Sequence, residues 1–350
     1  MIHDYFQKKI DDSKDVLRLA AEISREYYHA PLIITYSGGK DSDVLLQLAI
    51  ECLKPEDFEV LNSHTTLDAP ETVYYIRDKF KELNQIGIKT FVRYPHYDDG
   101  RPMSMWTLII DKKIPPTRSS RYCCEKLKET SSPNRFVAIG IRESESSGRR
   151  GRDAFTSNGT SKSEYFHYST QHIKEVFDDD RKRRGGEISP NEVGVYDCLF
   201  VKKAKENADL ICSPIYKWLD SEVWEFINER GMKYNPLYDK GFSRVGCLGC
   251  PLSSRQAQEL EMYPKYKEQF IRTFDKMLKK RKEIGKDDST GSWTSGEAVY
   301  KWWIQDKSIE GQMSIFDYEG GTNGISETTN ENQRTGEDGL FKDMALEHRT

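Results

Sequence analysis

One short stretch of the sequence carries the residue types that bind phosphate. The apolar run Leu32–Tyr36 stops at two glycines, and a helical apolar pattern follows directly. This order predicts a strand, a tight turn and a helix N-terminus, where backbone amides and the positive helix end bind phosphate. An ordinary strand–helix turn is the plainer alternative. The expected phosphate cradle comprises Ser37, Gly38, Gly39 and Ser42, with Lys40 as a positive charge and Asp41 as a ligand of Mg²⁺.

A second set of residues could bind a metal. Two cysteine pairs, Cys123-Cys124 and Cys247-x-x-Cys250, provide four thiols from distant segments. An odd total of seven cysteines argues against a disulfide framework and favours metal or redox use. Neighbouring basic residues would lower the pKa values of Cys123 and Cys124. The remaining thiols, which we expect in the core or on the surface, are Cys52, Cys198 and Cys212.

Alternating helical and strand patterns position the glycine turn. We expect helices over residues 4–30, 43–53 and 70–85, and strands over 32–36, 58–64 and 89–94. This alternation predicts an α/β protein with a doubly wound parallel sheet. Ligands of such sheets bind beyond the carboxyl ends of the strands. The turn at 37–42 and the segment at 66–72 should therefore meet in one crevice, although helix capping alone would also explain Asp68 and Glu71.

A further strand, at residues 136–141, leads into a charged segment. Gly140 and Arg142 would lie at the carboxyl end of this strand, in the same crevice. The planar guanidinium of Arg142 suits two contacts to phosphate oxygens. We expect Arg142 and Lys40 to neutralise phosphate charge. Later in the chain, Asp220 or Ser221 could cap a helix whose apolar face includes Trp224, which we expect in the core.

The length of 350 residues allows one large α/β domain with insertions, or two domains. We expect a nucleotide-binding domain over 1–255 with an insertion at about 149–198, a helical region over 256–320 and a disordered tail over 321–350. The insertion is either a solvated loop or a basic flap that contacts nucleic acid. In the helical region, Gln312–Phe316 resembles the pentapeptide that binds the bacterial sliding clamp, although a simple hydrophobic clip onto the domain is the plainer alternative.

The composition limits the classes of partner. A net charge of −4 and a pI near 6.1 do not suggest a general polyanion-binding protein, so contact with nucleic acid requires a local basic patch. Mean hydropathy is −0.76, and no apolar run approaches the roughly 18 residues of a membrane span. The N-terminus also lacks the apolar centre of a signal peptide. We expect a cytoplasmic protein without membrane contact.

The phosphate-binding stretch resembles a known family. Ser37-Gly38-Gly39-Lys40-Asp41-Ser42 is similar to the pyrophosphate loop of the N-type ATP pyrophosphatases and the PAPS reductases, and residues 140–146 resemble their Gly-x-Arg-x-x-Glu-Ser segment. The resemblance covers roughly residues 30–255. It implies an adenine nucleotide alpha-hydrolase-like (HUP-type) fold with helical C-terminal additions, and an adenine nucleotide as ligand. The residues that it places near the nucleotide include Asp68, Glu71, Thr72, Gly140 and Arg142.

The cysteine pattern Cys-Cys…Cys-x-x-Cys is similar to that of adenylylsulfate reductases and of DndC-type DNA phosphorothioation proteins. This resemblance implies a [4Fe-4S] cluster on Cys123, Cys124, Cys247 and Cys250. Structural zinc, a redox pair or no metal are the alternatives.

The expected reaction follows from one missing residue. Sulfonucleotide reductases use a C-terminal cysteine as nucleophile, and no cysteine follows Cys250 in this sequence. The resemblance therefore favours an ATP pyrophosphatase that transfers an adenylyl group from ATP to DNA or tRNA, with sulfur supplied by a cysteine desulfurase. The alternatives are a phosphoadenylyl or adenylyl sulfate reductase and a non-enzymatic nucleotide-binding subunit of a defence complex. The intact Lys40-Asp41 pair speaks against the last of these.

Overall fold

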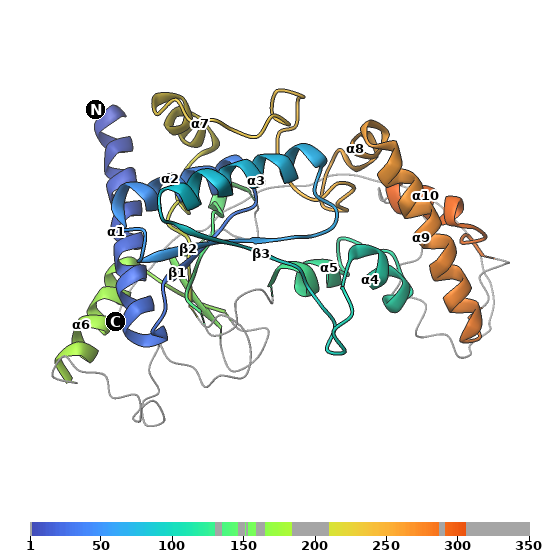
Figure 1. The fold of residues 1–350 in the computed structure, drawn as a ribbon, viewed down its shortest axis with the longest axis horizontal. Coiled ribbons are helices and arrows are strands. Elements are labelled where there is room, and N and C mark those ends of the chain that lie inside the picture. The colour runs from blue at the N-terminus through green and yellow to red at the C-terminus, as the bar shows by residue number, and fades with distance from the viewer. Residues whose placement is uncertain are drawn as a thin grey trace, which may run out of the picture. The chain divides into compact units, whose positions relative to one another are not determined.

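The computed structural model describes residues 2–129, 135–145, 151, 153–158, 165–183, 210–286 and 291–305. Three of the predictions, those on Cys198, on Gln312–Phe316 and on the tail, lie outside these residues. The described residues form a seven-stranded sheet with the order β3-β2-β1-β4-β7-β5-β6 (Figure 1). Its parallel strands are β1 (Leu32–Thr35), β2 (Phe58–Ser63), β3 (Lys89–Arg93), β4 (Val137–Ala138) and β7 (Leu210–Cys212).

The chain order of the strands shows how the sheet is wound. From β1 the chain moves outward through β2 to β3, and it then returns to place β4 on the other side of β1. This reversal is the switch point of a doubly wound sheet, where ligands bind. The predicted fold class is thus confirmed.

The interval predicted as an insertion contains regular structure in its described part. β5 (Phe155–Asn158) and β6 (Tyr165–Tyr168) form an antiparallel hairpin, and β5 also pairs antiparallel with β7. The hairpin therefore extends the sheet at one edge. It is followed by α6 (Thr170–Arg183).

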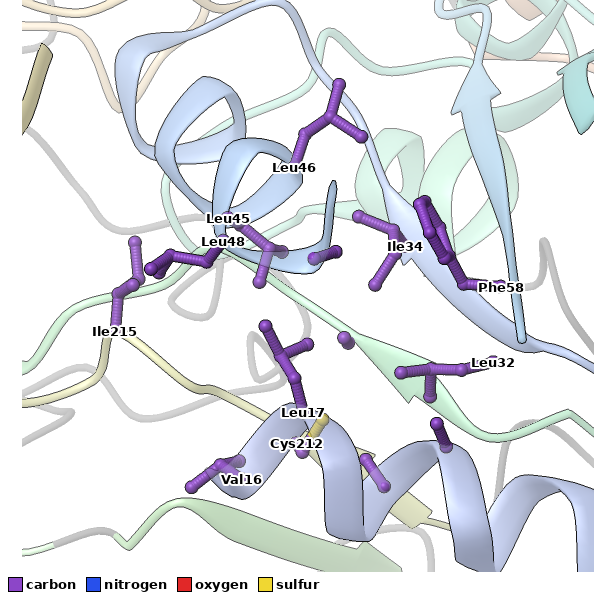
Figure 2. Close-up of a cluster of buried hydrophobic side chains, with 14 of the residues drawn as sticks. Val16, Leu17, Leu32, Ile34, Leu45, Leu46, Leu48, Phe58, Cys212 and Ile215 are labelled. Atoms are coloured by element: carbon purple, nitrogen blue, oxygen red, sulfur yellow. The ribbon is translucent and has the colours of Figure 1, made fainter. Parts of the chain in front are cut away.

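Helices cover the sheet face to which Leu32 and Ile34 of β1 point. α1 (Ile2–Tyr28) and α2 (Lys40–Cys52) both lie on this face and contact one another. Val16 and Leu17 of α1 and Leu45 of α2 pack with Leu32 and Ile34 in one buried cluster (Figure 2). The regular apolar spacing of both helices produces these buried faces. The next two helices beside α2 are α3 (Pro70–Gln85) and α7 (Asp220–Glu229) (Figure 1).

The remaining helices pack around a second cluster of buried side chains. Large apolar groups from α9, among them Phe270 and Phe274, pack with Trp303 of α10 and Leu260 of α8. The bounds are α4 Met105–Lys112, α5 Tyr122–Cys124, α8 Gln256–Met262, α9 Pro264–Glu283 and α10 Gly296–Ile304. Among the described residues, no helix is both long and apolar enough to cross a membrane.

Candidate functional site

The turn between β1 and α2 is held by its own side chains and by close packing. The Ser42 hydroxyl donates a hydrogen bond to the Gly39 carbonyl (2.7 Å) and accepts one from the Ser37 amide (3.3 Å). Gly38 has φ +73°, and a Cβ at this position would lie 2.9 Å from Cγ1 of Ile76 on α3. Only glycine both adopts this positive φ without strain and leaves room for the Ile76 side chain. The turn is therefore preshaped, with the N-terminus of α2 beside it.

Gly140 allows the end of β4 to approach this turn. A Cβ at Gly140 would lie 2.9 Å from the carbonyl oxygen of Asp41, so a larger residue would push the two segments apart. This contact carries Arg142 into the first turn of α2. Two predicted site segments, far apart in the chain, thus meet at the switch point of the sheet.

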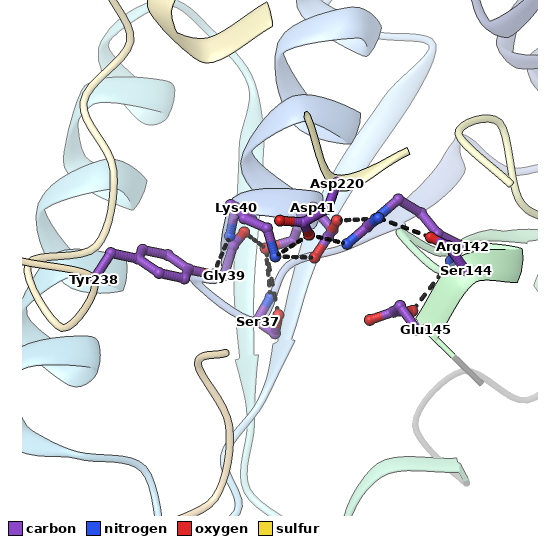
Figure 3. Close-up of polar contacts among 10 residues, drawn as sticks. Ser37, Gly39, Lys40, Asp41, Arg142, Ser144, Glu145, Asp220 and Tyr238 are labelled. Atoms are coloured by element: carbon purple, nitrogen blue, oxygen red, sulfur yellow. Dashed lines mark hydrogen bonds and ion pairs between the residues drawn. The ribbon is translucent and has the colours of Figure 1, made fainter. Parts of the chain in front are cut away.

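Four charged side chains form one ion-pair network here (Figure 3). Nε of Arg142 donates to Oδ1 of Asp41 at 2.5 Å, and its NH2 group donates to Oδ1 of Asp220 at 2.6 Å. Nζ of Lys40 lies 3.0 Å from Oδ1 of Asp220 and 3.5 Å from Oδ2 of Asp41. The two cations are buried, whereas the Asp220 side chain is 60% exposed. Two positive charges are therefore gathered beside the turn and balanced by two carboxylates.

The network favours the charged forms of Arg142 and Asp220. Although burial lowers the pKa of Arg142, the charges of Asp41 and Asp220 and the hydrogen bond to Asp41 outweigh burial and raise it. Burial raises the pKa of Asp220, but Lys40 and Arg142 outweigh it and lower that pKa. An incoming phosphate can exchange with such carboxylates, because it offers the same cations more negative oxygens.

Two side chains from the loop that follows α7 also hold the turn by hydrogen bonds. Nδ2 of Asn235, which is fully buried, donates to the Gly38 carbonyl and to Oγ1 of Thr72, both at 3.0 Å. The phenolic oxygen of Tyr238 accepts a hydrogen bond from the Lys40 amide at 2.9 Å. Its ring lies 5.7 Å from the Lys40 ammonium. Thr72 is thus connected to the turn through Asn235.

Asp68 and Glu71 lie in the same region but have other partners. Oδ2 of Asp68 accepts from the Thr65 amide at 3.1 Å, and the Asp68 backbone forms a β-bridge with Cys247. Oε1 of Glu71 pairs with Nζ of Lys240 at 2.5 Å. These contacts place Asp68 beside a cysteine segment.

The two cysteine pairs lie close enough to perturb one another. The charges of Cys247 and Cys250 both act on Cys123. The Cys123–Cys124 hydrogen bond, followed by burial, raises the pKa of Cys123. That same bond, with Arg121 and Lys128, lowers the pKa of Cys124 to about 5. The prediction of two lowered thiol pKa values is thus wrong for Cys123. When two adjacent thiols share a hydrogen bond, the pKa of one is raised and the pKa of the other is lowered.

The donor chemistry of these thiols fits a soft metal centre. None of the six cysteines in the described residues forms a disulfide. No set of three or more His, Cys, Asp or Glu side chains in that same part of the chain is arranged to hold a metal ion. The segments are nevertheless held together, because the Leu248 amide donates to the Leu67 carbonyl at 2.8 Å and Nε of Arg118 donates to the Pro251 carbonyl at 3.1 Å.

Residues 31–253 match the model of the phosphoadenosine phosphosulfate reductase domain. The chain belongs to this family. The match spans the glycine turn, Arg142 and all four paired cysteines, so the site lies within the PAPS reductase domain.

Two relatives are similar to this chain over much of its length. Two uncharacterized proteins of Methanocaldococcus jannaschii are 25% and 26% identical to it, over 78% and 82% of its length. The aligned regions make up 46% and 58% of those proteins, so the chain spans about half the length of these relatives.

Two solved structures resemble the chain with TM-scores of 0.38. A PAPS reductase from Candida auris, in a phosphate complex, is 16% identical and covers 67% of this chain and 88% of its own, with a TM-score of 0.38. The U34-tRNA thiolase NcsA from Methanococcus maripaludis, solved with its [4Fe-4S] cluster, is 13% identical. The match covers 88% of this chain and 83% of NcsA, also with a TM-score of 0.38.

Sequence reasoning missed three members of the site in this PAPS reductase domain. Asp220 was expected to cap α7, but it is the first residue of that helix and pairs with Lys40 and Arg142. Asn235 and Tyr238 lie in a loop whose sequence gives no sign of a contact with the turn. Trp224, expected in the core, is half-buried and lines a pocket.

Proposed function

We propose that this protein cleaves the α–β bond of ATP and transfers the adenylyl group to an acceptor in a sulfur-transfer reaction. Membership of the PAPS reductase domain family supports a role with nucleotides or sulfur. One observation carries the specific proposal: Lys40 and Arg142, both buried, meet beside a preshaped glycine turn. Cations at a helix N-terminus are what a departing pyrophosphate requires.

The chemistry then follows from charge. A hydroxyl or base oxygen of the acceptor attacks the α-phosphorus, the bond from this phosphorus to the bridging oxygen breaks, and pyrophosphate leaves with the electron pair. The acceptor releases its proton to solvent. Lys40, Arg142 and the amides around Gly39 stabilise the negative charge that develops on the leaving group.

A magnesium ion fits this arrangement once phosphate is bound. Both carboxylate oxygens of Asp41 now contact cations. When phosphate takes over Lys40 and Arg142, the Asp41 carboxylate is free to hold Mg²⁺ against the phosphate oxygens. The ion would supply further charge neutralisation.

The four paired cysteines would hold a [4Fe-4S] cluster. Their thiols, from two segments that the fold brings together, match the ligand number of such a cluster. The cluster would supply a redox-active, sulfur-binding iron centre. Arg121 and Lys128, which act electrostatically on Cys124, would balance its negative charge.

The acceptor and the sulfur donor belong to the same proposal. DNA or tRNA would accept the adenylyl group, and the persulfide of a cysteine desulfurase would displace this group as AMP. A thiol would then supply the two electrons that release the sulfur from the desulfurase onto the acceptor. Product analysis tests the proposal. Anaerobically purified protein with ATP, Mg²⁺ and either nucleic acid should yield AMP-linked products and pyrophosphate. ADP and inorganic phosphate would contradict it.

Sulfonucleotide reduction is the second candidate, and the family match itself favours it. Release of sulfite from adenylylsulfate or its 3′-phosphorylated form, in the presence of a thiol, would support this reaction. Absence of sulfite under these conditions would exclude this candidate.

A further inference from the structure

A pocket with aromatic walls adjoins the phosphate-binding turn. Its volume is about 320 Å³, and four of its seven lining residues are aromatic. These are Trp224, Tyr234, Tyr238 and Phe242. Asp220 also lines the pocket, and it is the carboxylate that pairs with Lys40 and Arg142. The pocket and the two phosphate-binding cations therefore share one wall.

The aromatic walls are held in place by edge-to-face packing. The Trp224 and Tyr238 rings have centroids 5.1 Å apart and cross at 86°, and Trp224 and Tyr234 are 5.4 Å apart at 89°. The Tyr238 hydroxyl is fixed to the Lys40 amide. Rings that are fixed in this way, and only half-buried, provide stacking surfaces for a planar ligand at little entropic cost.

The polar groups of the pocket select what stacks there. Asp220 and Asp239 are negative and would repel phosphate, but their oxygens accept hydrogen bonds from amino and ring N–H groups. Phosphate is attracted to Lys40 and Arg142 beyond Asp220. Arg244, which follows the lining residue Ser243 in the sequence, is exposed and has no ion pair or hydrogen bond within the described residues.

We infer that this pocket is a nucleobase site: an unpaired base stacks on the aromatic walls, and its phosphates contact Lys40 and Arg142 beyond Asp220. The inference rests on the proposed function for the nature of the ligand as a nucleotide. It adds where the base of that nucleotide binds. The base comes either from the nucleic-acid acceptor or from ATP, and binding measurements distinguish these sources.

Pairs of ligands that differ only in the base test the inference. A short fluorescein-labelled single-stranded oligonucleotide is compared with an abasic one of equal length at fixed salt, and ATP is compared with inorganic tripolyphosphate. Fixed salt matters because phosphate contacts dominate the affinity of both oligonucleotides. The variants are Phe242→Ala and Trp224→Ala. The matched control is Tyr74→Ala, an exposed aromatic residue on α3 outside the pocket.

We expect both pocket variants to weaken binding of a base-bearing ligand about tenfold and to leave its base-free partner unchanged. If the variants lose affinity for the oligonucleotide alone, the pocket binds a base of the acceptor. If they lose affinity for ATP alone, the pocket binds adenine. The inference would be overturned if a variant lost affinity equally for a base-bearing ligand and its base-free partner. It would also be overturned if affinity were unchanged for both pairs of ligands.

Photocrosslinking of the unaltered protein covers the case in which a variant fails to fold. A halogenated-uracil oligonucleotide or an azido-substituted ATP should crosslink at Trp224, Tyr238 or Phe242, as mapped by mass spectrometry. Crosslinks elsewhere only would overturn the inference. ATP cleavage is measured on the same wild-type sample. Base-dependent binding without ATP cleavage would refute the proposed function and leave the pocket assignment intact. ATP cleavage without base-dependent binding would refute the pocket assignment and leave the proposed function intact.

Discussion

The carboxylate of Asp220 accepts a hydrogen bond from the guanidinium of Arg142 at 2.6 Å. The same Asp220 oxygen lies 3.0 Å from the Lys40 ammonium. One exposed carboxylate on α7 thus contacts both cations that we assign to phosphate. A phosphate must compete with this carboxylate for the same positive charges.

Asp220→Asn should therefore strengthen the binding of pyrophosphate. Removing the negative charge frees Lys40 and Arg142, and exposed ion pairs contribute up to about 1 kcal/mol, so we expect the Kd to fall about fivefold. Isothermal titration calorimetry with pyrophosphate measures this. Asp239→Asn is the control, because Asp239 contacts Tyr234 and neither cation. An unchanged or higher Kd for Asp220→Asn would contradict the competition.

Gly140→Ala should destabilise the protein and displace Arg142. The added Cβ would lie 2.9 Å from the Asp41 carbonyl oxygen, and overpacking of this kind costs about 1–3 kcal/mol. Urea unfolding measures the change. Gly246→Ala is the matched control, because a Cβ at Gly246 meets no atom within 4 Å. Equal stability of the two variants would show that the contact between β4 and the turn is looser than described.

Asp43 should make stability depend on pH. Burial raises its pKa to about 7, and Tyr36, which donates to Oδ1 at 2.6 Å, only partly opposes this. Since the folded-state pKa exceeds the unfolded value, the native state binds more protons between about pH 4 and 7, and the free energy of unfolding falls as pH rises through that range.

Asp43→Asn should remove this dependence. The variant should be more stable than the wild type at pH 8, by up to about 4 kcal/mol if the full shift operates, and similar to it at pH 4. Urea unfolding of both proteins across this range is the measurement. Parallel pH profiles for the two proteins would show that Asp43 is charged in the native state at neutral pH.

The paired cysteines should give the anaerobically purified protein iron and visible absorbance. Cys123→Ser and Cys247→Ser each remove one ligand and should lower iron content and absorbance together. Cys52→Ser, which alters a half-buried thiol that packs beside α1, should change neither. A colourless, iron-free wild type would exclude the cluster.

Local sequence patterns predicted the elements around the turn because local physics determines them. The bounds of α2 and α3 follow from a glycine turn at one helix N-terminus and from Pro70 at the other. Gly38 could be assigned to the site because its turn requires glycine. Gly140 could be assigned because it stands at the carboxyl end of a predicted strand and matches the family's Gly-x-Arg segment. The shared crevice followed from the parallel topology.

The missed residues depend on contacts that no local pattern encodes. Asp220 begins a helix, so its sequence context suits a cap equally well, and only the tertiary fold brings it to Arg142. Asn235 acts through hydrogen bonds to the Gly38 carbonyl and Thr72, which are distant in sequence. The different pKa values of Cys123 and Cys124 likewise arise from a single hydrogen bond and from neighbours on other segments.

The bond that the protein cleaves in ATP tests the central claim most directly. Nucleotide products are separated after incubation with Mg²⁺ and nucleic acid for the wild type, Arg142→Lys and the surface control Arg230→Lys. Lysine keeps the charge of Arg142 but loses the planar group that spans Asp41 and Asp220, so we expect cleavage to slow about a hundredfold. The prediction is pyrophosphate and an adenylylated product from the wild type and Arg230→Lys. ADP and phosphate, no cleavage by any of the three, or equal rates for all three would contradict it.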